Sequence, residues 1–142
     1  MSNIIDSIEY HEDVLPTRFS LLDTSTYMAI IFGWAYERQL CSPMVYQNND
    51  LYGQNYELMK NNQISIEQFV LKYLDGTIRK DFFAEHLQEF MEDYIETATL
   101  TVDLCYFFKV DYIYAIPKDW QTCNSCFSFI DEHWESVKGN YG

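Results

Sequence analysis

The stretch from Tyr27 to Tyr36 is apolar on nearly every side of the helix that its residue spacing predicts. One stripe repeats at intervals of three and four residues, and more apolar side chains fill most of the opposite side. The stripe consists of Tyr27, Ile30, Ile31, Trp34 and Ala35, and the opposite side of Met28, Phe32 and Tyr36. Asp23-Thr24-Ser25, just before it, offers side chains that can cap a helix. Because such a helix must be packed from several directions, the sequence predicts a central helix.

The rest of the chain has enough apolar surface to surround that helix. Of 142 residues, 48% are hydrophobic and 18% aromatic, with only 5 Gly and 3 Pro. A chain of this size folds as one domain and buries a sizeable core without a metal or disulfide. We therefore predict a single domain over residues 1–142, with no cofactor and no metal.

Capping signals and apolar spacing predict further helices around the central one. They are a polar helix beginning at Ser42-Pro43, one capped by Ser65 and Gln68 and ended by Gly76, one over about residues 80–96, and one from Asp119 to Gly139. Residues 104–116 are dense in Tyr, Phe, Val and Ile, and residues 110–116 have the composition of a strand or an extended segment. A short helix followed by an extended piece fits equally well. The prediction is a mainly α domain of about five helices, packed around the first and last. A short extended or β segment near residues 106–116 is the open alternative.

The helix expected over residues 80–96 is acidic on one side. Its apolar stripe consists of Phe83, Leu87, Phe90 and Tyr94. Glutamates repeat at the same spacing two positions later, about 200° around the helix, so they face away from the core. They are Glu85, Glu89, Glu92 and Glu96. From residue 81 to residue 103 there are seven acids and no Lys or Arg, so no cation on the helix itself neutralises this side.

The charge and the apolar stretches of the chain indicate which partners and locations to expect. The formal charge is −13, which repels nucleic acid and anionic membrane surfaces. The longest apolar stretch, from Met28 to Ala35, is far shorter than the roughly 20 residues of a membrane span. The N-terminus has no secretory signal. We expect a cytoplasmic protein that contacts neither nucleic acid nor membrane directly.

The cysteines and histidines give weak signals for chemistry. Cys123 and Cys126 have the spacing of half a zinc site or of a redox pair, but no second pair accompanies them, so buried structural cysteines are favoured. His11, His86 and His133 each stand beside acids, but none shows the i, i+4 spacing of a helix-borne metal site. Histidines on solvated acidic faces are therefore favoured over a metal centre. With no phosphate loop, nucleophile elbow or basic aromatic patch, a non-enzymatic protein is favoured.

The chain is unusually rich in tyrosine, with 12 Tyr beside 10 Phe and 3 Trp. Tyrosine is a favoured anchor of protein interfaces. Tyr46, Tyr52 and Tyr56 are candidates for such contacts, although they equally fit packing along the polar helix.

Three segments resemble a family of small acidic bacterial proteins. Thr26-Tyr27-Met28-Ala29-Ile30-Ile31-Phe32-Gly33-Trp34-Ala35 is similar to a Thr-His-Ile-Gly-x-Phe/Tyr-x-x-Trp-Ala segment of that family. The other two are Ser65-Ile66-Glu67-Gln68-Phe69 with Leu74-Asp75-Gly76, and Asp119-Trp120 with Phe127, Ile130, Asp131 and Trp134. Tyr27 and Ala29 replace the family's His and Gly, which removes any role of that His. These relatives look like the immunity proteins found beside bacterial polymorphic toxins.

The resemblance implies a protein that binds one cognate toxin and blocks it without doing chemistry. A toxin that cuts nucleic acid has a cationic substrate cleft, which an acidic helix face could occupy in place of phosphate. We expect the charged contacts to be Glu85, Glu89, Glu92, Asp93 and Glu96. Two alternatives stay open: an acidic DNA mimic that inhibits DNA-binding defence enzymes, and a metal-dependent hydrolase that uses clustered carboxylates.

Overall fold

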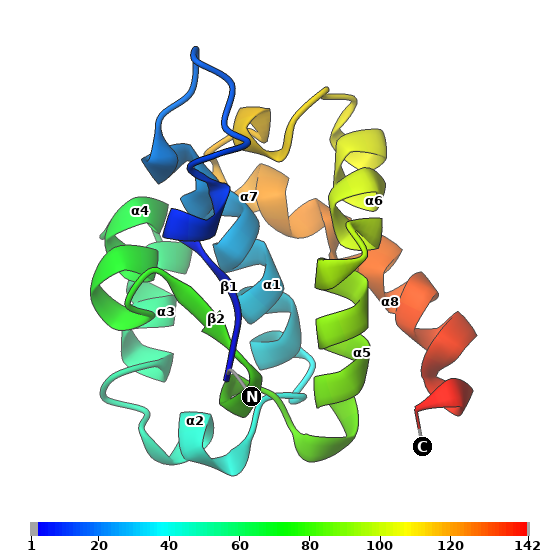
Figure 1. The fold of residues 1–142 in the computed structure, drawn as a ribbon. Helices are drawn as coiled ribbons and strands as arrows, with labels where there is room; N and C mark the ends of the chain where they lie inside the picture. Colours follow the sequence, from blue (N-terminus) through cyan, green and yellow to red (C-terminus); the bar gives the residue numbers. More distant parts are fainter. Residues whose placement is uncertain (1–2, 142) are drawn as a thin grey trace.

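A single helix, α1 (Ser25–Glu37), forms the centre of the molecule (Figure 1). The structure is a computed structural model that describes residues 3–141. Every residue of α1 from Ser25 to Ala35 is buried, as expected for a helix that is apolar on all sides. The predicted central helix is therefore confirmed.

Helices cover α1 on several sides, so the predicted mainly α, single compact domain is also confirmed. They are α2 (Pro43–Gln47), α3 (Gly53–Lys60), α4 (Ile66–Gln68), α5 (Glu85–Glu96), α6 (Thr99–Phe108), α7 (Trp120–Cys123) and α8 (Phe127–Val137). In Figure 1, α3 and α4 lie on one side of α1, and α5, α6 and α8 lie on the other. No helix in residues 3–141 combines the length and apolarity that crossing a membrane requires.

The only sheet in the described part of the chain lies where no strand was predicted from the sequence. β1 (Ile4–Ser7) pairs antiparallel with β2 (Thr77–Arg79), with an irregularity between Ile4 and Asp6. Strands this short carry no readable alternation of apolar and polar residues.

The strand considered for residues 110–116 is wrong. α6 covers residues up to Phe108, and a 3-10 turn follows at Ile113–Ala115. Ile113 and Tyr114 are buried, and within residues 3–141 their segment pairs with no strand, so tertiary packing overrides its strand propensity. The alternative of a short helix followed by an extended piece comes closer.

The helix predicted over residues 80–96 begins later than expected. Lys80–Phe82 is a 3-10 turn, and α5 starts only at Glu85. Between them Phe83 is extended and forms an isolated bridge with Cys41. Pairing with a distant segment therefore breaks the helix before α5.

Other predicted helix boundaries also shift. The polar helix is divided into α2 and α3, and the last helix into α7, a 3-10 turn and α8. The expected cap of α1 by Asp23-Thr24-Ser25 is wrong, because a 3-10 turn (Leu21–Thr24) leads directly into α1 and the Ser25 N–H donates to the Leu22 carbonyl. The Ser65 cap is confirmed, since its hydroxyl accepts a 2.9 Å hydrogen bond from the Gln68 N–H.

Candidate functional site

The acidic side of α5 has the orientation that the sequence predicts. Its inward residues are all buried, namely Leu87, Phe90, Met91, Tyr94 and Ile95. The acids opposite them are exposed or, for Glu92, half-buried. We use "acidic face of α5" for Glu85, Glu89, Glu92, Asp93 and Glu96.

One acid of this face is paired with a cation of the fold, and another accepts a hydrogen bond. Lys80 Nζ lies 3.4 Å from Glu92 Oε1, and Asp93 Oδ2 accepts a 2.9 Å hydrogen bond from the Tyr141 hydroxyl. Within residues 3–141, Glu85, Glu89 and Glu96 form no ion pair. The segment itself carries no cation, as the sequence shows, but Arg79 and Lys80 just before it pair with Asp81 and Glu92. The expectation of an unneutralised acidic side therefore holds for the three glutamates and not for the whole segment.

The basic residues are largely engaged elsewhere. Six of the nine Lys and Arg side chains form ion pairs with acids of the fold. These are Arg38 with Asp131, Lys60 with Glu37, Arg79 with Asp81, Lys80 with Glu92, Lys118 with Asp23 and Glu67, and Lys138 with Glu135. Among them only Lys80 reaches α5.

The position of the acids along α5 adds to their unfavourable electrostatics. Glu85 is in the first turn, where the helix dipole favours a negative charge. Glu92, Asp93 and Glu96 lie toward the other end, where the partial charge of the helix is itself negative and no basic residue occupies the last turn. This arrangement is not one that maximises the stability of the free protein.

A groove opens beside the acidic face, between the end of α5, the start of α6 and the flank of α8. Its volume is about 470 Å³. It is lined by Phe90, Asp93, Tyr94, Thr97, Thr99, His133, Val137 and Tyr141, which we call the α5–α8 groove. His133 stacks on Tyr94 with ring centroids 4.3 Å apart and is half-buried, so it does not lie on a fully solvated face as predicted.

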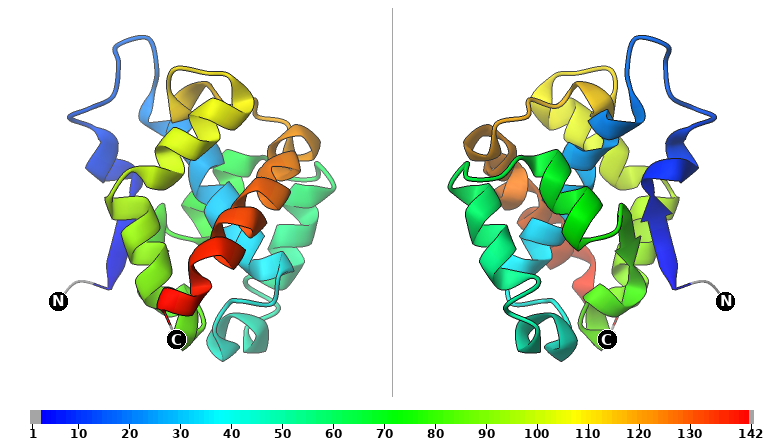
Figure 2. Two further views of the ribbon diagram at one scale, coloured as in Figure 1. Left: turned by 90° about the vertical axis from the view of Figure 1, so that its right-hand side faces the viewer. Right: turned by 90° about the vertical axis from the view of Figure 1, so that its left-hand side faces the viewer.

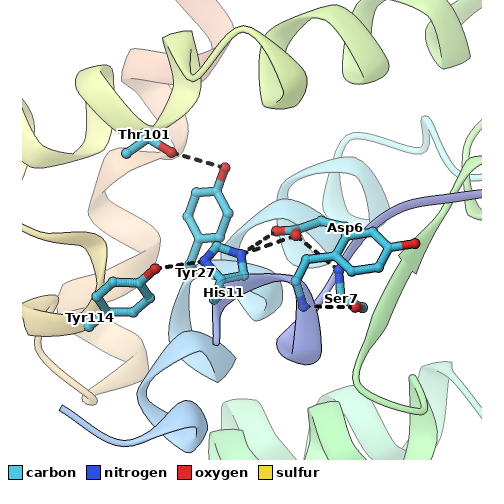
Figure 3. A network of polar contacts seen from close by, with 7 residues as sticks. Asp6, Ser7, His11, Tyr27, Thr101 and Tyr114 are labelled. Atoms are coloured by element: carbon cyan, nitrogen blue, oxygen red, sulfur yellow. Dashed lines mark hydrogen bonds and ion pairs between the residues drawn. The ribbon is translucent and has the colours of Figure 1, made fainter. Parts of the chain in front are cut away.

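A second polar cluster surrounds His11, which also does not lie on a solvated face (Figure 3). Its Nε2 is 2.9 Å from Asp6 Oδ2, and its Nδ1 is 2.7 Å from the Tyr114 hydroxyl. Burial, together with nearby Asp6, raises the pKa of Tyr114. Both imidazole nitrogens are thus occupied inside the fold, and the hydroxyl beside them is not an activated nucleophile. The cluster links the β1 region to residues 113–115 and supports a stabilising role.

The cysteine pair has the surroundings of structural thiols. Cys123 and Cys126 are both buried and free, and burial raises the pKa of each thiol to about 12. The Cys123 thiol donates a 2.8 Å hydrogen bond to the Pro117 carbonyl. Both thiols are therefore protonated at neutral pH, whereas metal binding and redox exchange use the thiolate.

A protein-family model matches most of the chain. The model is described as "Domain of unknown function (DUF7832)", and it matches residues 4–117. The chain belongs to this family. Comparison with curated proteins and with solved structures gives no match. The matched part includes α1, α6 and every residue of the acidic face of α5. It ends before α7 and α8.

The tyrosines predicted as partner contacts are not brought together with the acidic face. Tyr52 and Tyr56 are 4% and 0% exposed, so their assignment to an interface is wrong. Both rings pack against Phe32, and the Tyr56 hydroxyl donates to the Glu37 carboxylate, as buried tyrosines require. Tyr46 is 36% exposed, but α2, which carries it, is not adjacent to α5 in this member of the family (Figure 1).

Sequence reasoning missed the groove beside the acidic face. Asp93 and Tyr141 are 48 residues apart, and Tyr94 and His133 are 39 apart, so their contacts depend on how α5 and α8 pack. The apolar spacing of both helices was readable, but it does not determine which flanks meet.

Proposed function

We propose that this chain is a cytoplasmic immunity-type protein that binds a cognate bacterial toxin and neutralises it by occlusion. The acidic face of α5 would contact a cationic surface of the toxin, such as the substrate cleft of a nuclease. The observation that carries this proposal is that Glu85, Glu89 and Glu96 are exposed and form no ion pair within residues 3–141. The proposed activity is binding, and it involves no chemistry.

The energetics of the acidic face support a role outside folding. Acids four residues apart on one helix repel each other by a few tenths of a kcal/mol per pair. The pairs on α5 are Glu85 with Glu89, Glu89 with Asp93, and Glu92 with Glu96. Docking against a cationic surface would offset this repulsion with attraction between the acids and the partner's positive charges.

The total charge supports rapid association with a basic partner. A formal charge of −13 creates a long-range field, and complementary potentials raise association rates to about 10⁸–10⁹ M⁻¹s⁻¹ at low salt. Because the Debye length is about 8 Å at physiological ionic strength, the rate should fall steeply as salt is added. Charge of this sign also disfavours nucleic acid and anionic membranes as direct partners.

The test is neutralisation of a toxin domain encoded in the reading frame next to this gene. Co-expression of that domain with this chain should restore growth, and the two purified proteins should bind with an affinity that falls as salt rises. If the neighbouring frames encode toxin domains and none is bound or neutralised, the proposal is wrong. Binding to many unrelated DNA-binding proteins would instead favour the DNA-mimic alternative.

A further inference from the structure

The α5–α8 groove adjoins the acidic face and shares Asp93 with it. Figure 2 shows α5, α6 and α8 together on one face of the molecule, in its left-hand view. The groove volume of about 470 Å³ is within the usual range for ligand sites, roughly 300–1,000 Å³. Because Asp93 belongs to both, a partner docked on the acidic face would reach the rim of this groove.

Each hydroxyl group of the groove already donates a hydrogen bond within the fold. The Tyr141 hydroxyl donates to Asp93, and the Tyr94 hydroxyl donates to Asp103 at 2.6 Å. The Thr97 hydroxyl donates to the Asp93 carbonyl at 2.6 Å. The Thr97 and Thr99 hydroxyls are 2.8 Å apart and hydrogen-bonded. Because the Thr97 hydroxyl donates its one hydrogen to the Asp93 carbonyl, Thr99 is the donor in this bond.

What remains available in the groove is a set of acceptors. Asp93 Oδ1 accepts no hydrogen bond from residues 3–141, and the Thr99 oxygen keeps free lone pairs. Apart from the His133 imidazole, the polar side chains of the groove can thus accept hydrogen bonds but cannot donate them. An occupant that carries only donors satisfies this pattern.

The negative charge and the aromatic lining of the groove indicate which kind of donor group fits it. Two carboxylates, Asp93 and Asp103, lie on this side of the groove, each accepting a hydrogen bond from a tyrosine hydroxyl that lines it. The walls are aromatic, with Phe90 5.1 Å from Tyr94 and 5.6 Å from Tyr141 between ring centroids. A planar, weakly hydrated cation with several donors suits such walls better than a compact, strongly hydrated ammonium group.

We infer that the α5–α8 groove receives the guanidinium group of an arginine side chain from the partner that the acidic face of α5 contacts. This inference rests on the proposed function for the source of the arginine. The guanidinium donates to Asp93 Oδ1 and to the Thr99 hydroxyl, and its flat face lies against the aromatic wall. A lysine would supply the charge but not the flat, forked donor set.

The probe is N-acetyl-arginine amide, titrated into the full-length protein and followed by backbone amide NMR shifts. N-acetyl-citrulline amide is the matched neutral control, because it has nearly the same shape without the charge. Saturable shifts confined to residues 93–99, 133, 137 and 141 are expected with arginine, and much smaller ones with citrulline and with N-acetyl-lysine amide. Asp93→Asn should weaken arginine binding about three- to tenfold, whereas Glu57→Gln on α3 should leave it unchanged.

Equal shifts with arginine and citrulline, or arginine shifts spread along α5 without groove residues, would overturn the inference. No saturable shift with arginine would overturn it as well. None of these results affects the proposed function, which is tested by toxin neutralisation. Conversely, a saturable arginine site in a chain that neutralises no toxin would refute the proposed function and leave the groove's guanidinium specificity in place.

Discussion

Neutralising two glutamates of the acidic face should stabilise the free protein. Glu89 belongs to two like-charged i, i+4 pairs of α5, so Glu89→Gln relieves about 0.4–1 kcal/mol of repulsion. Glu96 belongs to one such pair and also lies in the last turn, where the helix dipole opposes it, so Glu96→Gln relieves about 0.5–1 kcal/mol. The double variant should therefore gain about 1–2 kcal/mol in its free energy of unfolding.

Urea denaturation at about 20 mM and about 500 mM salt measures this gain. Because salt screens charges separated in water, the gain should shrink strongly at the higher salt concentration. Glu57→Gln is the matched control: Glu57 is an exposed helical glutamate on α3 whose neighbour three residues on is Lys60, so losing its charge relieves no repulsion. A double variant no more stable than wild type at low salt, or a gain that does not depend on salt, would refute the reasoning about the acidic face.

Two further predictions concern how α1 is held in place. Asp131 accepts hydrogen bonds from Trp34 Nε1 at 2.8 Å and from Arg38 at 2.9 Å. Partial burial raises the pKa of Asp131, but these hydrogen bonds outweigh it and hold the pKa below its ordinary value. Asp131→Asn should cost about 1–2 kcal/mol at pH 7, discounted for partial exposure, and this deficit should shrink as pH falls below about 4 because wild type loses its charge there. A deficit that is constant down to pH 2 would contradict this assignment. Gly33→Ala should lower unfolding free energy by about 1–3 kcal/mol, since its Cβ would lie 2.9 Å from the Trp120 ring, and unchanged thermal stability would contradict the tight packing.

Local periodicity predicted the parts of the fold that depend on one segment alone. The burial of α1 and the opposition of apolar and acidic sides on α5 both follow from residue spacing within a helix, and both are confirmed. The Ser65 cap depends on two residues three apart and is equally readable.

Features that depend on distant segments were not readable. The break before α5 exists because Phe83 pairs with Cys41, and β1 exists because it pairs with β2, which follows it by about 70 residues of chain. The burial of Tyr52 and Tyr56 likewise results from packing against α1, which propensity does not reveal. The same holds for the candidate site. The placement of its acids follows from the sequence of α5 alone, whereas the groove beside them forms only where α8 packs against α5.

The most direct test is the affinity of the cognate toxin domain for wild type and for Glu89→Lys/Glu96→Lys, measured over a range of salt concentrations. The proposed function predicts that charge reversal raises the Kd at low salt by tenfold or more and flattens the dependence of log Kd on log salt. Circular dichroism and unfolding curves verify that the variant stays folded. If the Kd and its salt dependence both stay at their wild-type values, the acidic face of α5 is not the binding surface.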